Sequence, residues 1–319
     1  MIQDSRKLIR INTDYLLAEE RTIDFDIYTK APNSPKPILL VAANSIIADI
    51  KEVLARKNYG PLFINQESAK KFENFMEDSL NSIIRNATIP LEQKSSVVHA
   101  CAKNIIRDVF DDPRSGKNIA RAKTITGNII DLTLENTQSI LHLLRLGSHN
   151  YYTFSHCVNV AVFAIGLWLR IRKNDHTELN DFALGCILHD VGKSQIMDNI
   201  LQKPGKLDHD EFEVIKKHPG QGHRLMANHA SEITLDVIMH HHEKINGTGY
   251  PDGLTGNQIS DNAKIATIAD VYDALTTNRP YAGARQPLSA LTLMKKEMVG
   301  HFEQKRFEEF ILFLGGRPA

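Results

Sequence analysis

The stretch LGCILHDVGK, at residues 184–193, places His189 and Asp190 side by side at the end of an apolar run. The run predicts a buried helix. An imidazole and a carboxylate in this position are costly to remove from water unless they are paired or bound to a cation. A metal ion removes that cost, so the pair indicates a metal centre in the core of a helical segment.

More candidate ligands lie downstream of this pair. His218, the pair His241-His242 and Asp270 follow, and Asp270 ends the apolar run of residues 265–269. With His189 and Asp190, these nitrogen and oxygen ligands are enough for two metal ions. A set of this kind points to hydrolytic chemistry.

Histidines are concentrated in one part of the chain, because 11 of the 14 fall within residues 149–242. Alone, His156 would more often be a buried or capping histidine, and His218 a surface histidine near a helix end. Their clustering favours a site for both.

The three successive histidines at residues 240–242 are not equivalent. Neighbouring residues of a helix point about 100° apart, so we expect two of the three to face one metal. Asp273 follows Asp270 by one helical turn, and we expect it to hold a ligating histidine or to cap a helix.

The composition narrows the classes of partner. The chain has 319 residues and 42% hydrophobic content, which suits a globular protein with a core. Lys plus Arg and Asp plus Glu number 38 each, so the net charge is zero. We therefore expect no nucleic-acid partner, and partners have to be inferred from sites.

Membrane and export signals are not predicted. The N-terminus MIQDSRKLIRINTD lacks the apolar core and cleavage site of a signal peptide. The longest apolar stretches, residues 37–47 and 157–169, fall short of the ~20 residues that span a bilayer. Cys101, Cys157 and Cys186 are typical of reduced core thiols, and a core role is favoured over a ligand role even for Cys186. We expect a cytoplasmic protein without a membrane span.

Three segments are expected along the chain. Residues 1–65 contain the strand-like runs LIRI, RTIDFDIYT, PILLVAA and PLFI, and predict a small β-rich domain. A 3.6-residue period then predicts a helical connector at residues 66–118, which ends at the turn-rich DDPRSG. Residues 119–319 predict a helical domain, so the expected fold class is mainly α.

Periodicity in the third segment predicts seven helices, at residues 120–146, 153–172, 181–190, 209–228, 233–242, 262–276 and 287–313. Residues 247–256 are rich in glycine and form a long turn-rich loop beside the candidate ligands. Irregular loops in such a place often carry function.

Taken together, these motifs resemble the HD-GYP family, a branch of the HD-domain phosphohydrolases. The resemblance covers about residues 119–315 and depends on motifs in a fixed order. They are His156, LHDVGK at 188–193, NILQKPGKL with Glu211, KKHPG with His218, HHEKINGTGYPDGL at 241–254, and IADVYDALTTNRPY at 268–281.

The resemblance implies an all-helical HD-GYP domain that hydrolyses the bacterial second messenger cyclic di-GMP to pGpG and, in some members, to GMP. It implies Asp190 as a bridging ligand and Lys193 near the scissile phosphate. It also implies that Arg279 binds a phosphate and that Gly249-Tyr250-Pro251 is the signature loop, whose Tyr250 offers a ring or a hydroxyl to the substrate. The implied metal ligands are His156, His189, Asp190, His218, His241, His242 and Asp270.

Two positions depart from the family pattern. Tyr152 stands where some members have a carboxylate that holds a third metal, and a phenol is a poor ligand for a hard cation, so we expect two metals. Mixed His and Asp ligands favour iron or manganese, with nickel, cobalt or zinc compatible. Ala282 stands where many relatives have a basic residue, which bears on substrate affinity.

Alternative readings stay open at this stage. The chain could hydrolyse another cyclic dinucleotide such as 3′,3′-cyclic GMP-AMP, or act on other nucleotides. It could also be a slow ligand-binding sensor that signals through a partner. The N-terminal domain is interpreted as a regulatory or scaffolding module. A protein partner at the Gly249–Pro251 loop or at that domain is compatible with the sequence, as is a homodimer.

Overall fold

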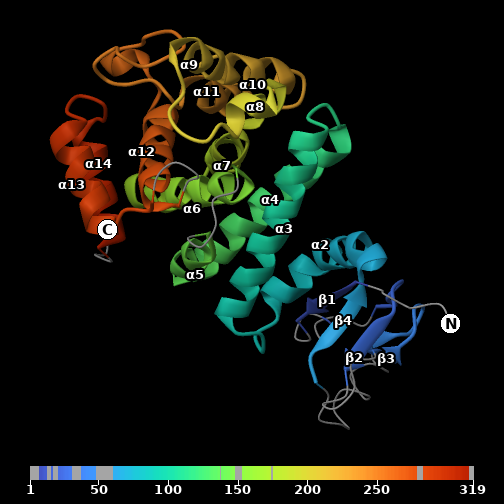
Figure 1. The fold of residues 1–319 in the computed structure, drawn as a ribbon. Coiled ribbons are helices and arrows are strands. Elements are labelled where there is room, and N and C mark those ends of the chain that lie inside the picture. Colours follow the sequence, from blue (N-terminus) through green and yellow to red (C-terminus); the bar gives the residue numbers. More distant parts are fainter. Residues whose placement is uncertain are drawn as a thin grey trace. The chain divides into compact units, whose positions relative to one another are not determined.

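A computed structural model describes residues 7–12, 16, 21–30, 37–47, 60–136, 138–147, 153–173, 175–278 and 283–315. Contacts divide the chain into two compact units, residues 1–101 and 102–319. Figure 1 shows strands in the first unit and helices throughout the second. The expected class, mainly α with a small β-rich N-terminal domain, is confirmed.

The first unit contains a four-stranded antiparallel sheet in the order β1-β4-β2-β3. Its strands are β1 (Leu8–Ile11), β2 (Ile27–Lys30), β3 (Pro37–Val41) and β4 (Leu62–Asn65). Each falls within or beside one of the strand-like runs of the sequence. Leu62 and Ile64 alternate with less buried residues along β4, as expected where one face of a strand is buried.

The short helix η2 (Gln66–Ser68) leads from the sheet into α2 (Ala69–Arg85). The apolar stripe of α2 is buried at helical spacing, at Phe75, Met76, Leu80, Ile83 and Ile84. Phe25 contacts the rings of Phe72 and Phe75 edge to face, at centroid distances of 5.6 and 5.8 Å. α2 therefore shares a core with the strand segments, and α3 (Leu91–Asp111) follows it.

In the part that the structure describes, the regular elements of the second unit are all helices. They are α4 (Gly116–Glu135), α5 (Gln138–Gly147), α6 (Thr153–Arg172), α7 (Leu179–Leu188), η3 (Val191–Gln195), α8 (Asp198–Leu201), α9 (His209–Ile215), α10 (His218–Met226), α11 (Glu232–His240), η4 (Gly256–Gln258), α12 (Asp261–Thr276), α13 (Pro287–Glu297) and α14 (Gln304–Leu314).

Three of the predicted helices are each broken into two. At residues 120–146 the break falls at Asn136, whose backbone is extended and whose side-chain oxygen accepts the N–H of Gln138. At residues 209–228 it precedes Pro219, which suits the first turn of a new helix. At residues 287–313 the chain turns at Gly300, with a φ of +77°.

α6 lies in the core of the second unit. It packs against α5, α7, α12 and α14, and its residues 155–168 are all buried. By length and composition α6 could cross a membrane, which the apolar stretches of the sequence did not predict, but 78% of its most apolar window is buried inside the protein. Burial of this extent is what a core helix shows.

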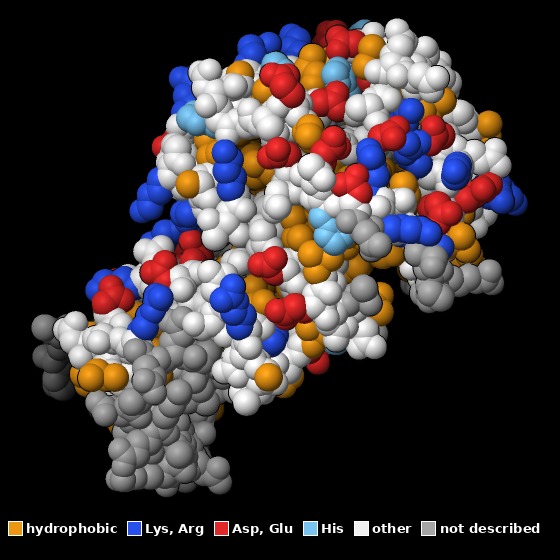
Figure 2. Space-filling model, turned by 180° about the vertical axis from the view of Figure 1, so that it is seen from behind, with side chains coloured by type: hydrophobic (Ala, Val, Ile, Leu, Met, Phe, Trp, Pro, Cys, Tyr) orange, Lys and Arg blue, Asp and Glu red, His pale blue; other side chains and the backbone are white. Residues whose placement is uncertain are grey.

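The charges on the surface are mixed. On the face drawn in Figure 2, Lys and Arg side chains alternate with Asp and Glu side chains. Ion pairs of the second unit include Arg170 with Glu309 at 2.7 Å and Arg121 with Asp108 at 2.8 Å. Among the side chains that the structure describes on this face, the two signs of charge are therefore interspersed.

Candidate metal centre

Five segments of the second unit bring the seven predicted ligands together. His156 lies in the first turns of α6, His189 and Asp190 follow α7, His218 begins α10, His241 and His242 follow α11, and Asp270 lies in α12. Two groups of potential ligand atoms result, each within 4.8 Å. The Asp190 group is Asp190, His218, His241 and His242, and the His156 group is His156, His189 and Asp270.

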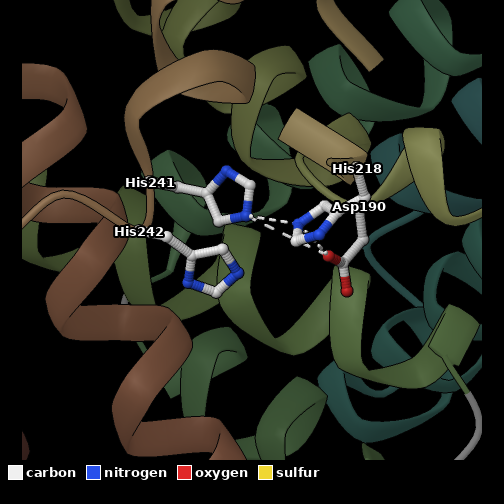
Figure 3. A group of neighbouring side chains, drawn as sticks. All are labelled: Asp190, His218, His241 and His242. Atoms are coloured by element: carbon white, nitrogen blue, oxygen red, sulfur yellow. Dashed lines mark hydrogen bonds and ion pairs between the residues drawn. The ribbon is translucent and has the colours of Figure 1, made fainter. Parts of the chain in front are cut away.

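In the Asp190 group, the side chains converge from three segments (Figure 3). Asp190 Oδ1 lies 3.3 Å from His218 Nε2 and 4.0 Å from His241 Nε2. The two Nε2 atoms are 3.2 Å apart. Asp190, His218 and His241 are all at most 1% exposed, so these atoms face one another away from water.

The His156 group lies on the other side of the same carboxylate. Asp190 Oδ2 is 3.4 Å from His189 Nε2 and 3.8 Å from His156 Nε2. His156 Nε2 is also 3.1 Å from Asp270 Oδ1. Asp190 thus presents one oxygen to each group.

Hydrogen bonds fix the tautomers of three histidines. The Nδ1 atoms of His189, His218 and His241 lie 2.7, 2.8 and 2.9 Å from the backbone carbonyls of Cys186, Ile215 and Ile238. A carbonyl can only accept, so each Nδ1 carries the proton and donates it. In this tautomer each ring directs its Nε2 toward the centre, as metal-bound histidines do.

With these tautomers, several buried hydrogen-bond acceptors face one another without a donor between them. With both Nδ1 atoms protonated, the neutral rings of His218 and His241 point lone pairs at each other across 3.2 Å. His189 Nε2 and Asp190 Oδ1 are buried and make no hydrogen bond. Such atoms are costly unless a cation lies among them. The donor set therefore fits metal ions.

The protonation states of the Asp190 group agree with this. Burial lowers the pKa of His241 well below 6.5 and that of His242 to about 3, so both rings are neutral. Burial alone would raise the pKa of Asp190, but Lys193 and His189 hold it well below its usual range. Neutral imidazoles beside ionised carboxylates are the forms that bind metals.

His156 is oriented by a carboxylate. Asp273 Oδ2 accepts from His156 Nδ1 at 2.7 Å, and its Oδ1 accepts from Asn159 at 2.9 Å and Thr277 at 3.1 Å. The sequence predicted that Asp273 would hold a histidine or cap a helix, and the structure shows the former. Its hydrogen bond turns the Nε2 of His156 toward Asp270.

Replacing Asp273 with asparagine should weaken metal binding by about 10- to 100-fold, the usual cost of losing a group that orients a ligating histidine. An amide cannot accept from His156, Asn159 and Thr277 as the carboxylate does. Titration of the metal-free protein with Mn²⁺ would measure this. Asp131→Asn, at an exposed position on α4, is the matched control, and equal affinities for the two variants would contradict the prediction.

Metal binding should release a proton from His156. Burial would lower the pKa of His156, but hydrogen bonds to Asp270 and Asp273 outweigh it and raise that pKa to about 9. The ring is therefore charged at pH 7 in the metal-free chain and must lose its proton to bind a metal.

Affinity for Mn²⁺ should rise between pH 7 and pH 9, by up to about tenfold per unit, and then level off. The stability that this raised pKa gives the metal-free protein is present below pH 6.5 and is lost as the pH rises toward 9. Calorimetry in two buffers of different ionisation enthalpy would count the released protons. A count near zero at pH 7 would show that His156 is already neutral.

Of the three successive histidines, two face the centre. His240 instead lies 2.8 Å from Asp236 and 3.2 Å from Asp252. The sequence predicted that two of these three histidines would face one metal, and the structure places two of them in the Asp190 group. Cys186 contacts the site through its carbonyl, and burial raises the pKa of its thiol well above the usual value.

The remaining predicted residues are placed as follows. Lys193 Nζ lies 2.6 Å from Asp190 Oδ2, with 20% of its side chain exposed. The ring of Tyr250 lies 4.6 Å from that of His242 at an angle of 31°, and burial raises its pKa. Arg279, Tyr152 and Ala282 lie outside the residues that the structure describes.

Glu243 is a residue of the site region that the sequence did not single out. It is 1% exposed and accepts the backbone N–H groups of Asp252, Gly253 and Leu254 at 2.7 to 3.0 Å. A Cβ on Gly249 would lie 2.5 Å from the Cα of Glu243, so only glycine fits there. The available signal was an acidic residue between a histidine pair and a glycine-rich loop. Glu243 fixes the loop that carries Tyr250 against the ligand-bearing end of α11.

Glu243→Ala should lower kcat/KM by about tenfold or more, because three backbone N–H groups of the loop lose their partly buried acceptor. Glu243→Gln keeps one acceptor oxygen and should recover part of the loss. Metal content should stay at the wild-type value in both, since Glu243 belongs to neither ligand group. Elemental analysis beside steady-state kinetics would test this, and loss of metal in Glu243→Gln would contradict it.

Comparison with known proteins finds a family and named relatives. Residues 165–305 match the model of the HD domain family. The chain is 35% identical over 240 residues to the cyclic di-GMP phosphodiesterase PA4108 of Pseudomonas aeruginosa. The matched region covers 73% of this chain and 58% of that protein. The chain is also 38% identical over 150 residues to the 3′3′-cGAMP-specific phosphodiesterase 3 of Vibrio cholerae. That match covers 46% of this chain and 32% of the relative.

A solved structure shares the fold. Bd1817, an HDG"Y"P protein from Bdellovibrio bacteriovorus, matches with a TM-score of 0.70 and 21% identity, over 97% of this chain and 100% of that one. The fold and site define an all-helical domain with a buried His and Asp metal centre. The chain belongs to the HD-domain family, in its HD-GYP branch. It spans 58% or less of the length of the two phosphodiesterases above.

Proposed function

We propose that the chain is a metal-dependent phosphodiesterase that hydrolyses cyclic di-GMP to pGpG. Relatives that carry this name, in Pseudomonas aeruginosa and in Xanthomonas campestris, support the substrate class. The observation that carries the proposal is Asp190, whose two oxygens face two separate groups of buried nitrogen and oxygen ligands. A carboxylate in this position suits a pair of cations.

The seven ligands of the two groups would hold two divalent metal ions, for which iron or manganese fits the mixed His and Asp set best. When bound, such ions supply Lewis-acid stabilisation of phosphate charge and activation of water. Tyr152 in place of a carboxylate supports two ions rather than three.

The chain's own groups then have distinct roles. The ammonium of Lys193, partly exposed beside Asp190, would steady the phosphate oxygens or protonate the leaving 3′ oxygen. Tyr250 packs on His242 and would hold that ring in place while its hydroxyl meets the substrate. Arg279 would bind a phosphate with its planar fork of donors.

A second candidate is hydrolysis of 3′,3′-cyclic GMP-AMP. Three relatives in Vibrio cholerae are named phosphodiesterases specific for this molecule, with identities of 25 to 38%. Both molecules are cyclic dinucleotides with the same phosphodiester linkage, so the metal centre suits either. The intact ligand set speaks against a third option, a sensor without turnover.

We further propose how the chain is organised. We assign catalysis to residues 119–319, a connecting role to 66–118 and a regulatory or scaffolding role to 1–65. We place the protein in the cytoplasm, where cyclic dinucleotides signal.

Product analysis tests the activity. The protein is purified without oxygen, its metals are measured, and it is incubated with cyclic di-GMP or 3′,3′-cyclic GMP-AMP. We expect pGpG from the former at the higher kcat/KM. A higher kcat/KM on cyclic GMP-AMP would establish the second candidate, and no turnover of either by metal-loaded protein would refute both.

A further inference from the structure

Tyr250 is poorly placed to stack a substrate base. Its ring already packs on His242, at a centroid distance of 4.6 Å and an angle of 31°. A second contact, with the ring of His218 at 6.4 Å, is edge to face. The ring is therefore used to support two metal ligands.

Phe212 lies one ring further out from the metal ligands. It belongs to α9 and meets Tyr250 edge to face at 6.4 Å, with an angle of 81° between the rings. It is 43% exposed, so part of its ring is open to a ligand. In a cyclic dinucleotide the base projects outward from the phosphate across the ribose, so a ring at this distance can meet a base.

Lys216 follows Phe212 by one helical turn. Its ammonium lies 5.0 Å from the centroid of the Phe212 ring and 2.6 Å from Glu213. An ammonium has three donors, so this one can serve a ligand besides Glu213. Guanine presents two acceptors, O6 and N7, on one edge, whereas adenine presents a donor and an acceptor there.

We propose that Phe212 of α9 and Lys216, which caps the C-terminus of α9, form a guanine subsite, in which the base stacks on Phe212 and Lys216 donates to its O6 or N7. This inference rests on the proposed function and specifies the base that is recognised. Guanine occurs in both cyclic di-GMP and cyclic GMP-AMP, so the subsite suits either substrate. A cation and an aromatic ring one turn apart also occur on helix surfaces without a ligand, and the experiment separates the two cases.

The test uses the full chain loaded with Mn²⁺ and three substrates. Cyclic di-GMP carries guanines, cyclic di-AMP carries adenines, and bis(p-nitrophenyl) phosphate is a diester without a base. Phe212→Ala should raise KM for cyclic di-GMP about tenfold, as expected for a lost stacking platform, with kcat within about twofold. Its constants on bis(p-nitrophenyl) phosphate should match the wild type, and Phe212→Trp should restore KM. Leu141→Ala, an exposed apolar residue of α5, is the control.

Lys216→Gln tests the choice of base. It should lower the preference for cyclic di-GMP over cyclic di-AMP, measured as the ratio of kcat/KM, by about tenfold. Lys217→Gln removes the same charge at the next, exposed position and should leave the ratio unchanged.

The outcomes separate the two proposals. Wild-type protein that cleaves bis(p-nitrophenyl) phosphate but not cyclic di-GMP refutes the proposed function, and the subsite with it. Wild-type turnover of cyclic di-GMP with an unchanged KM in Phe212→Ala refutes the subsite alone. Equal losses on all three substrates would also refute it, because they would show that Phe212 only stabilises the fold around the metals.

Discussion

Replacing Asp190 with alanine is expected to lower kcat on cyclic di-GMP by at least about a thousandfold. One oxygen of Asp190 faces His218 and the other faces His189, so the substitution removes a ligand from both groups at once. The stabilisation that paired cations give to phosphate charge is several kcal/mol, and each 1.36 kcal/mol is about a factor of ten in rate.

The fold should survive this change. In the absence of metal, removing the carboxylate deletes a buried charge that is paired with Lys193, whose side chain still reaches solvent. Circular dichroism and size-exclusion chromatography would check this. Asp131→Ala removes an exposed carboxylate from α4 and serves as the control. Near-wild-type turnover by folded Asp190→Ala protein would show that the two groups do not share this ligand.

The sequence was enough to predict the candidate ligands, which the structure brings together in two groups, because a buried polar residue in an apolar run is a local feature of the chain. His189 and Asp190 stand out within an apolar run, and Asp270 ends another, since an unpaired charge there would be costly. Hydrophobic periodicity is also a local feature of the sequence, and it located the helices. The three missed breaks each depend on one local residue: the side chain of Asn136 competes for backbone hydrogen bonds, Pro219 starts a new helix, and Gly300 takes a positive φ.

Other features required the three-dimensional structure. Glu243 binds backbone N–H groups about ten residues further on, and a backbone donor leaves no trace in the sequence. The requirement for glycine at position 192 also comes from a contact between distant residues, because a Cβ there would lie 1.9 Å from the carbonyl oxygen of His218. Phe212 looks like an ordinary apolar residue of an amphipathic helix until its exposure is known. Long-range packing decides each of these, and periodicity carries no record of it.

Removing the metals is expected to abolish activity and lower the melting temperature by at least about 10 °C. Each ion that binds the folded chain at a hundred times its Kd contributes about 2.7 kcal/mol, and 1 kcal/mol shifts a domain of this size by about 2 to 4 °C. Without cations, the lone pairs of His218 and His241 face each other at 3.2 Å in the core. This repulsion adds to the loss.

The measurement compares chelator-treated protein before and after Mn²⁺ or Fe²⁺ is restored, by differential scanning fluorimetry and by turnover of cyclic di-GMP. Both properties should return together, with about two ions bound per chain. Mg²⁺ prefers oxygen ligands and should restore much less of either. Asp190→Ala should gain little melting temperature from Mn²⁺, because its ligand groups have lost their shared carboxylate. Full activity in the presence of chelator, with the melting temperature unchanged, would show that the buried histidines have a structural role only.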